Sequence, residues 1–186
     1  MKQEYIITAY SENHIGLLNR ITIIFTRRKV NIESLTVSQS ALKGISKFTI
    51  VVSETKDRVI NIVKQIDKQI EVLKAFYNTN DEMIFQEIAL YKVPTIALME
   101  SDQIEKMIRL HNARILEITR EYTVIEKTGH EEETQALFEG LNTFGVLQFI
   151  RSGRIAITRS PIERLSEFLK ERDSLFEKLE EKKKLN

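Results

Sequence analysis

The feature of this 186-residue sequence that most constrains its fold is an order of strands and helices that occurs twice. In the first half, four short segments are predicted to be strands, from their β-branched and aromatic residues at 5–10 and from apolar alternation at 31–39, and two segments have apolar residues at helical spacing. The predicted strands are residues 5–10, 31–39, 45–52 and 72–77. One predicted helix follows Gly16, and the other begins at Asp57. This β-α-β-β-α-β order within about 75 residues predicts the ferredoxin-like split motif.

The same order returns after residues 78–82, a polar segment that predicts a domain boundary. Ser152 and Gly153 are predicted to form a two-residue hairpin turn into an added strand. The second set comprises strands at 84–93, 113–119, 122–127, 146–151 and 154–158 and a helix at 102–111. A second helix is predicted to begin with a capping box at Thr128 to Glu131 and to end near Leu141. We therefore expect an α+β protein with two tandem ferredoxin-like domains, residues 1–78 and 83–160.

The last segment, residues 161–186, is predicted to be a helical tail. It begins at Pro161, a residue that suits the first turn of a helix. Its apolar residues lie near one stripe of that helix, and seven basic residues balance seven acidic ones. Two interpretations stay open: a solvated amphipathic helix, or a coiled-coil or partner-docking helix.

The composition argues against several classes of protein. The sequence has 28 basic and 27 acidic residues and a net charge of +1, which gives no general electrostatic reason to bind nucleic acid or an anionic membrane. It contains no cysteine, which excludes disulfides, thiolate nucleophiles and cysteine-based metal sites. No stretch approaches the roughly 18 apolar residues that a membrane-spanning helix needs, and the N-terminus lacks the apolar region of a signal peptide. We expect a cytoplasmic protein.

The segment between the first predicted strand and the first predicted helix has the features of a binding loop. Asn13 is predicted to cap the helix, whose first amides carry a partial positive charge and can hold a carboxylate. Gly16 has no Cβ, so a ligand or a neighbouring backbone can approach closely. Tight packing of the helix on the sheet explains this glycine equally well, and that alternative stays open.

A second candidate residue, Asn31, opens the second predicted strand. In a ferredoxin-like sheet this strand is an edge, and a bare edge can pair with another chain. If two copies pair there, the loop at 13–18 of one copy can face Asn31 of the other. Such a site offers amides for a carboxylate, an amide oxygen for an ammonium group, and apolar walls, which are the needs of a free aliphatic amino acid. A plain turn residue is the alternative explanation of Asn31.

An enzyme active site has little support in this sequence. The histidines are His14, His111 and His130, and no Ser/His/Asp order, carboxylate pair or metal-ligand spacing stands out. His111 and His130 are expected at helix ends. His14 lies in the candidate loop, where contact with a ligand stays open.

An RNA-binding module also has the order β-α-β-β-α-β, but its third strand carries aromatic residues that stack on bases. Ile45, Lys47 and Ile50 occupy the comparable positions here. We therefore expect no nucleic-acid partner.

The first half contains the pattern Asn13-x-x-Gly16-x-Leu18-x-Arg20, followed by Phe25 and by NIESLTV at 31–37. This pattern resembles the acetolactate synthase regulatory small-subunit family, whose N-terminal module is an ACT domain, a small-molecule sensor. In the second half, EIALYKV at 87–93 resembles the opening strand of that family's second domain, and RSGRIA at 151–156 resembles its closing motif. The resemblance covers about residues 3–159. Gln86 stands where the family often has Arg, and the tail is longer than in compact bacterial members.

The resemblance implies a chain without an active site, metal or cofactor of its own. A separate catalytic large subunit, dependent on thiamine diphosphate, would condense two pyruvates or pyruvate with 2-oxobutyrate. This chain would raise that activity and make it sensitive to valine or another branched-chain amino acid. We also expect a homodimer through the ACT domains, paired along the second predicted strand. An ACT-type amino-acid sensor acting on a different partner enzyme is the alternative.

The resemblance further implies which residues bind the effector. The implied effector-binding residues are Asn13, Ile15, Gly16 and Leu17 of one copy together with Asn31 and Ile32 of the other. We expect the effector carboxylate at the helix amides and the effector side chain against Ile15, Leu17 and Ile32.

Overall fold

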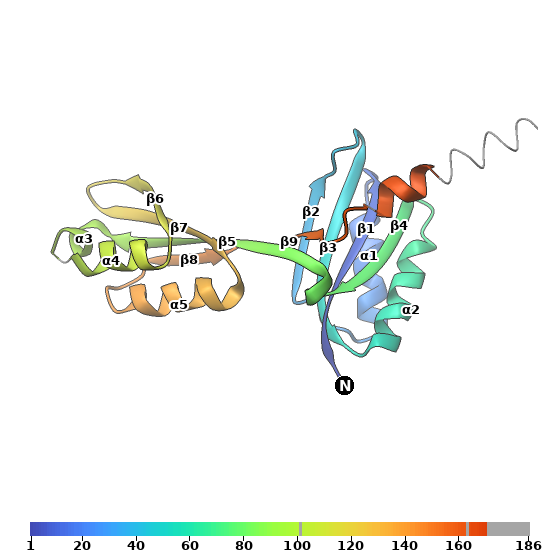
Figure 1. The fold of residues 1–186 in the computed structure, drawn as a ribbon, viewed down its shortest axis with the longest axis horizontal. Coiled ribbons are helices and arrows are strands. Elements are labelled where there is room, and N and C mark those ends of the chain that lie inside the picture. The colour runs from blue at the N-terminus through green and yellow to red at the C-terminus, as the bar shows by residue number, and fades with distance from the viewer. Residues whose placement is uncertain (101, 163, 171–186) are drawn as a thin grey trace, which may run out of the picture. The chain divides into compact units, whose positions relative to one another are not determined.

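The computed structural model describes residues 1–100, 102–162 and 164–170. The chain divides into two compact units (Figure 1). The first contains residues 1–84 and the described residues from Ala156 onward, and the second contains residues 85–155. Each unit is built on an antiparallel sheet with helices packed against it, so the predicted α+β class is confirmed.

The first unit has the strand order β2-β3-β1-β4, with β1 and β3 in the middle. Its elements are β1 (Gln3–Glu12), α1 (Leu17–Arg27), β2 (Ser34–Gln39), β3 (Ile45–Glu54), α2 (Lys56–Asp67) and β4 (Val72–Thr79). Strand β2 pairs only with β3 in this sheet, so it is an edge strand, as the predicted motif requires. A short 3-10 helix, η1 (Asn80–Glu82), follows β4 in the polar segment.

Helices α1 and α2 bury one apolar face each against this sheet. The buried residues of α1 are Leu17, Ile21, Ile24 and Phe25, and those of α2 are Val59, Ile62, Val63 and Ile66. Each fully buried aliphatic side chain contributes about 1.5–3 kcal/mol. Helix α2 ends at Asp67, so Ile70 does not extend its buried face, and the Ile70 side chain is 97% exposed.

The opposite face of the same sheet is also buried. Residues of β1 alternate between the two faces: Ile7 belongs to the core under the helices, whereas Ile6, Thr8 and Tyr10 point to the other side and are at most 4% exposed. Residues from the C-terminal part of the chain lie on that side, where the Lys47 Nζ donates to the carbonyl oxygen of Ala156 at 2.5 Å.

The beginning of the predicted tail packs on the first unit. Residues 164–170 are helical, and Leu165 is 2% exposed. The Arg164 guanidinium lies 5.0 Å from the centroid of the Phe76 ring on β4. Pro161 itself lies in a bend before the described helix rather than in its first turn. The rest of the predicted tail, residues 171–186, lies outside the described residues.

The second unit repeats the order of the first, β6-β7-β5-β8. Its elements are β5 (Met83–Pro94), whose first two residues belong to the first unit, α3 (Thr95–Glu100), α4 (Asp102–Leu110), β6 (Arg114–Ile118), β7 (Tyr122–Gly129), α5 (Glu131–Asn142) and β8 (Gln148–Arg151). Strand β9 (Ile155–Thr158) follows, and from Ala156 onward it belongs to the first unit. Helix α3 was not predicted. Tyr91 is fully buried in this unit's core, where its hydroxyl donates to the Thr134 carbonyl oxygen at 2.6 Å, and burial raises its pKa to about 12.

The predicted hairpin at Ser152 and Gly153 is wrong. Strands β8 and β9 both pair with β5. The Ser152 amide donates to Ile88 O at 2.8 Å, and the Arg159 amide donates to Glu82 O at 2.9 Å. As the chain advances from β8 to β9 its partners therefore move steadily back along β5, and the chain keeps its direction. Residues 152–154 interrupt one edge strand instead of reversing it.

The predicted capping box at the start of α5 is displaced by two residues. Thr128 and Gly129 belong to β7, and His130 is the N-cap residue. The His130 amide donates to Glu133 Oε2 at 2.7 Å. This hydrogen bond, the largest cause, holds the pKa of Glu133 below its usual value of 4.5.

The capping bond predicts a pH-dependent stability difference. Because the folded-state pKa of Glu133 is lowered, its contribution is present above the unfolded-state pKa and is lost as the pH falls through the folded-state pKa. Glu133→Ala is expected to lower the free energy of unfolding by about 1 kcal/mol at neutral pH. Urea unfolding over a pH series should show this difference shrinking in acid. Glu132→Ala, which removes a charge from the same turn, is the control, and an equal loss in both variants would contradict the prediction.

Candidate functional site

The loop between β1 and α1 holds the first group of predicted site residues. Asn13, His14, Ile15 and Gly16 are all exposed. The Asn13 amide donates to Gly44 O at 3.0 Å, which ties the start of the loop to the turn between β2 and β3. The loop is therefore anchored at its base and open to solvent at its tip.

Gly16, not Asn13, occupies the N-cap position of α1, so the prediction that Asn13 caps the helix is wrong. Gly16 has φ 83° and ψ −4°, a left-handed conformation that glycine adopts without steric cost and that turns the chain directly into the helix. A Cβ built on Gly16 would meet no atom within 4 Å among the described residues. Tight packing inside the chain therefore does not explain this glycine.

The N-terminus of α1 is open to an anion. No side chain of the described residues caps it, and its first turn contains no acidic residue. The first amides of a helix lack intrahelical partners and carry a partial positive charge. Arg20, at the end of that turn, is paired with Glu71 at 2.7 Å, and this hydrogen bond is the largest cause that lowers the pKa of Glu71. The Leu17 amide already donates to His14 O at 3.3 Å, so the backbone amides that follow it are the main donors that this end of the helix offers.

The apolar side chains around the loop differ from the predicted set in one respect. Leu17 is 2% exposed and belongs to the core under the helices, so in this conformation its side chain is not at the surface. Ile15 and Leu18 are 97% and 46% exposed. Leu18 was not among the predicted effector residues. The helical spacing of Leu17 and Ile21 could have placed it outside the core.

Asn31 and Ile32 lie in the connection from α1 to β2. The prediction that Asn31 opens the second strand is wrong, because β2 begins at Ser34. Asn31 is exposed, and Ile32 is partly buried against the helix-side core. Since α1 has 11 residues and rises about 1.5 Å per residue, Gly16 and Asn31 stand at opposite ends of it, about 16 Å apart along its axis. One chain therefore does not bring the two groups of predicted residues together.

Two further properties bear on the kind of site. Among residues 1–100, 102–162 and 164–170, no three His, Cys, Asp or Glu side chains are arranged to hold a metal ion. In the same part of the chain, no helix has the length and apolar character to cross a membrane.

Comparison with known proteins gives matches over both units. Residues 7–74 match the model of the AHAS small subunit-like ACT domain, and residues 86–160 match the model of the small subunit of acetolactate synthase. The acetolactate synthase small subunit of Bacillus subtilis (strain 168) is 36% identical over 162 residues, which cover 87% of this chain and 94% of that protein. The small subunit of Mycobacterium leprae (strain TN) is 35% identical over 150 residues, or 81% of this chain and 88% of that protein.

A solved structure shares the same fold over most of the chain. The crystal structure of the acetolactate synthase small subunit from Thermotoga maritima matches with a TM-score of 0.77 and 26% sequence identity. The match covers 86% of this chain and 99% of that one.

Proposed function

The chain belongs to the family of acetolactate synthase small subunits, and from this premise we propose that it regulates a catalytic large subunit. It activates that thiamine-diphosphate-dependent partner and makes it sensitive to feedback inhibition by valine. The observation that carries the proposal is the uncapped N-terminus of α1, opened by the left-handed Gly16 on an exposed loop. The names of the curated relatives support the choice of partner.

The proposed effector is held as a zwitterion. Its carboxylate accepts hydrogen bonds from the amides at the start of α1, and its ammonium group donates to the Asn31 side-chain oxygen of a second copy. Its aliphatic side chain packs on Ile15 and Leu18 of one copy and on Ile32 of the other. Hydrogen bonds to a charged group contribute about 1.5–3 kcal/mol each, and burying a valine side chain contributes about 1.5–3 kcal/mol. After the cost of association, micromolar to millimolar affinity is expected.

The second copy is proposed to pair along the open edge of β2. A two-fold axis at this edge makes the two β2 strands antiparallel and places the same surface on both sides of the interface. Gly16 and Asn31 lie at opposite ends of α1, so the reversed direction of the second copy can bring its Asn31 toward the first copy's Gly16. This arrangement provides two equivalent effector sites per dimer.

A lysine in place of an exposed apolar residue of the edge strand β2 is expected to weaken this dimer. Val37 lies on β2 and is 44% exposed, and charged residues on an edge oppose strand pairing. Val37→Lys should raise the dimer dissociation constant by about tenfold or more, because two lysines meet near the two-fold axis. Light scattering over a concentration series measures the change, with Val37→Thr as the matched control. A wild-type chain that stays monomeric at micromolar concentration would refute the proposed dimer.

Reconstitution with the large subunit tests the proposed function. Addition of the chain should raise acetolactate formation, and titration with valine, leucine or isoleucine should then lower it. A coupling free energy of about 1–3 kcal/mol between the two sites suffices for such inhibition. Absence of both effects would refute the proposal. Effector binding without any effect on the large subunit would instead indicate an ACT-type sensor for another enzyme.

A further inference from the structure

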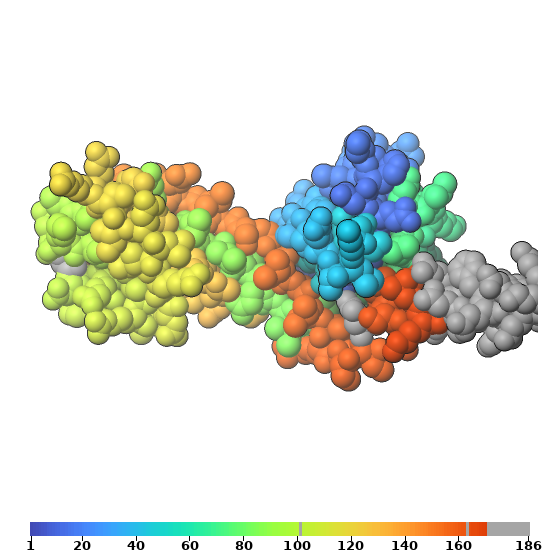
Figure 2. Space-filling view, turned by 90° about the horizontal axis from the view of Figure 1, so that it is seen from above, coloured from blue at the N-terminus to red at the C-terminus, as the bar shows by residue number. Residues whose placement is uncertain are grey.

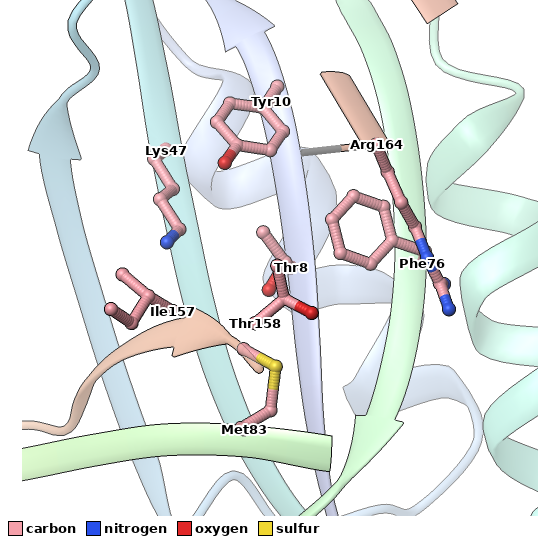
Figure 3. Close-up of a pocket in the computed structure, with 8 residues that line it drawn as sticks. All are labelled: Thr8, Tyr10, Lys47, Phe76, Met83, Ile157, Thr158 and Arg164. Carbon is pink, nitrogen blue, oxygen red and sulfur yellow. The ribbon is translucent and has the colours of Figure 1, made fainter. Parts of the chain in front are cut away.

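The first unit contains a cavity on the sheet face opposite α1 and α2. Its volume is about 180 Å³. For comparison, an apolar cavity of about 150 Å³ is large enough to hold benzene. The walls come from β1, β3 and β4, from the beginning of β5, and from the C-terminal part of the chain. The lining residues are Thr8, Tyr10, Lys47, Phe76, Met83, Ile157, Thr158 and Arg164 (Figure 3).

A buried hydroxyl group at this cavity lacks a partner. Thr8 is 1% exposed, and its Oγ1 forms no hydrogen bond with any described residue. Figure 3 shows Thr8 beside Thr158, between Lys47 and the Phe76 ring. Burying a hydroxyl without a hydrogen bond is costly, and such a group in a folded protein calls for an explanation. A bound molecule with a polar end provides one.

The charge of the lining points to an anion. Lys47 and Arg164 are cationic, and none of the eight described lining residues is acidic. The Lys47 Nζ bonds to Ala156 O and lies 6.0 Å from the centroid of the Tyr10 ring. The positive charge of Lys47, rather than an additional N–H group, would attract an anion to this wall. Figure 2 shows the C-terminal part of the chain, in orange, packed against the first unit.

The remaining wall is apolar. Phe76, Met83 and Ile157 contribute an aromatic ring, a thioether chain and a branched aliphatic chain (Figure 3). Such groups accommodate a short hydrocarbon chain, and none of the described lining residues offers a carboxylate to an ammonium group. A zwitterionic amino acid therefore fits this cavity poorly.

We propose that this cavity binds a small monocarboxylate with a short apolar chain. The carboxylate lies at Lys47 and accepts a hydrogen bond from the Thr8 hydroxyl, and the chain packs on Phe76, Met83 and Ile157. The site differs in place and in ligand chemistry from the proposed effector loop, and it does not depend on the proposed function. Because sheet and C-terminal residues both line it, the ligand holds these two parts of the first unit together.

Calorimetric titration of the full chain with sodium 3-methylbutanoate tests the site. Saturable binding is expected, with about one ligand per chain. Lys47→Met should weaken it about tenfold, because a charge-assisted contact is lost. Thr8→Val should weaken it about threefold without lowering the melting temperature, because the buried hydroxyl has no partner in the unliganded chain.

Two matched variants serve as controls. Lys43→Met removes an exposed lysine in the turn before β3, and Thr36→Val removes another unpartnered hydroxyl on the same sheet. Neither residue lines the cavity, so both variants should bind 3-methylbutanoate like the wild type. The uncharged 3-methylbutanol should bind more weakly, and valine should not compete.

Three results would overturn the inference. The first is absence of saturable heat with 3-methylbutanoate. The second is binding that neither Lys47→Met nor Thr8→Val weakens. The third is a crystal soaked with 3-methylbutanoate in which only water occupies the cavity. Thr8→Val is nearly isosteric and keeps the test valid even if Lys47→Met fails to fold.

Discussion

Replacing Gly16 with aspartate is expected to abolish feedback inhibition by valine while preserving most of the activation of the large subunit. The added carboxylate would stand where the effector carboxylate is proposed to bind and would repel it. Gly16 has φ 83° with open space around its Cβ position, and aspartate tolerates this conformation better than most residues. Loss of one charged hydrogen bond costs about 1.5–3 kcal/mol, which corresponds to about ten- to a hundredfold weaker binding.

Two controls separate charge from backbone strain. Gly16→Asn has nearly the same shape and no charge, so it should reduce valine sensitivity less. Gly145→Asp places the same residue at a left-handed glycine of the second unit, where φ is 80° and the Cβ position is also open. This second variant should remain sensitive to valine. Wild-type inhibition of a reconstituted Gly16→Asp complex would contradict the prediction.

Replacing Glu87 with glutamine is expected to destabilise the second unit strongly. Glu87 is 5% exposed and faces two guanidinium groups, with Arg154 Nε at 3.3 Å and Arg151 Nε at 3.8 Å. Removing one partner of a buried ion pair leaves the other charge uncompensated and costs about 3–5 kcal/mol. Arg151 keeps a contact to Glu131 at 2.9 Å, so a loss near 3 kcal/mol is expected.

Hydrogen exchange measures this loss in the second unit alone. Amides of β5 and β8 should exchange faster in Glu87→Gln, while amides of β1 and β3 should keep their wild-type rates. Glu117→Gln, an exposed change on β6, is the control. If the free energy of opening measured at the β5 amides changes by less than about 1 kcal/mol, the ion pairs of Glu87 contribute little to the stability of the second unit.

Much of the fold could be predicted from the period of the apolar residues. The β-branched residues in 45–52 and the helical spacing of Leu17, Ile21 and Ile24 act through local geometry, and both elements form where they were predicted. The edge position of β2 followed from the motif, because its strand order is fixed by short connections.

The errors have physical causes that the local sequence does not contain. Ser152 and Gly153 suit a hairpin turn, but the choice between reversing the chain and continuing along β5 depends on which strand offers an open edge. Gly16 is the N-cap residue of α1 because its left-handed backbone turns the chain into the helix. A glycine permits this conformation but does not require it, so the residue type alone did not predict the cap. Leu165 is buried in the first unit by residues that are distant in the sequence. A stripe of apolar residues predicts that one face of a helix is buried, but it does not predict the surface on which that face packs.

The candidate site was predicted as two groups of residues that would meet between two paired copies. The exposed loop at Asn13 to Gly16 has the open helix terminus that the sequence suggested. Asn31 lies at the other end of α1, and its meeting with the loop requires a second copy. This step rests on symmetry rather than on contacts within one chain.

A mixed dimer tests that step most directly. Chains carrying Gly16→Asp and chains carrying Asn31→Ala should each fail to bind valine alone. When equal amounts are unfolded and refolded together, each mixed dimer regains one intact site, so about a quarter of the wild-type binding capacity should return. Calorimetry with valine that shows no recovery in verified mixed dimers would contradict a site shared between two copies.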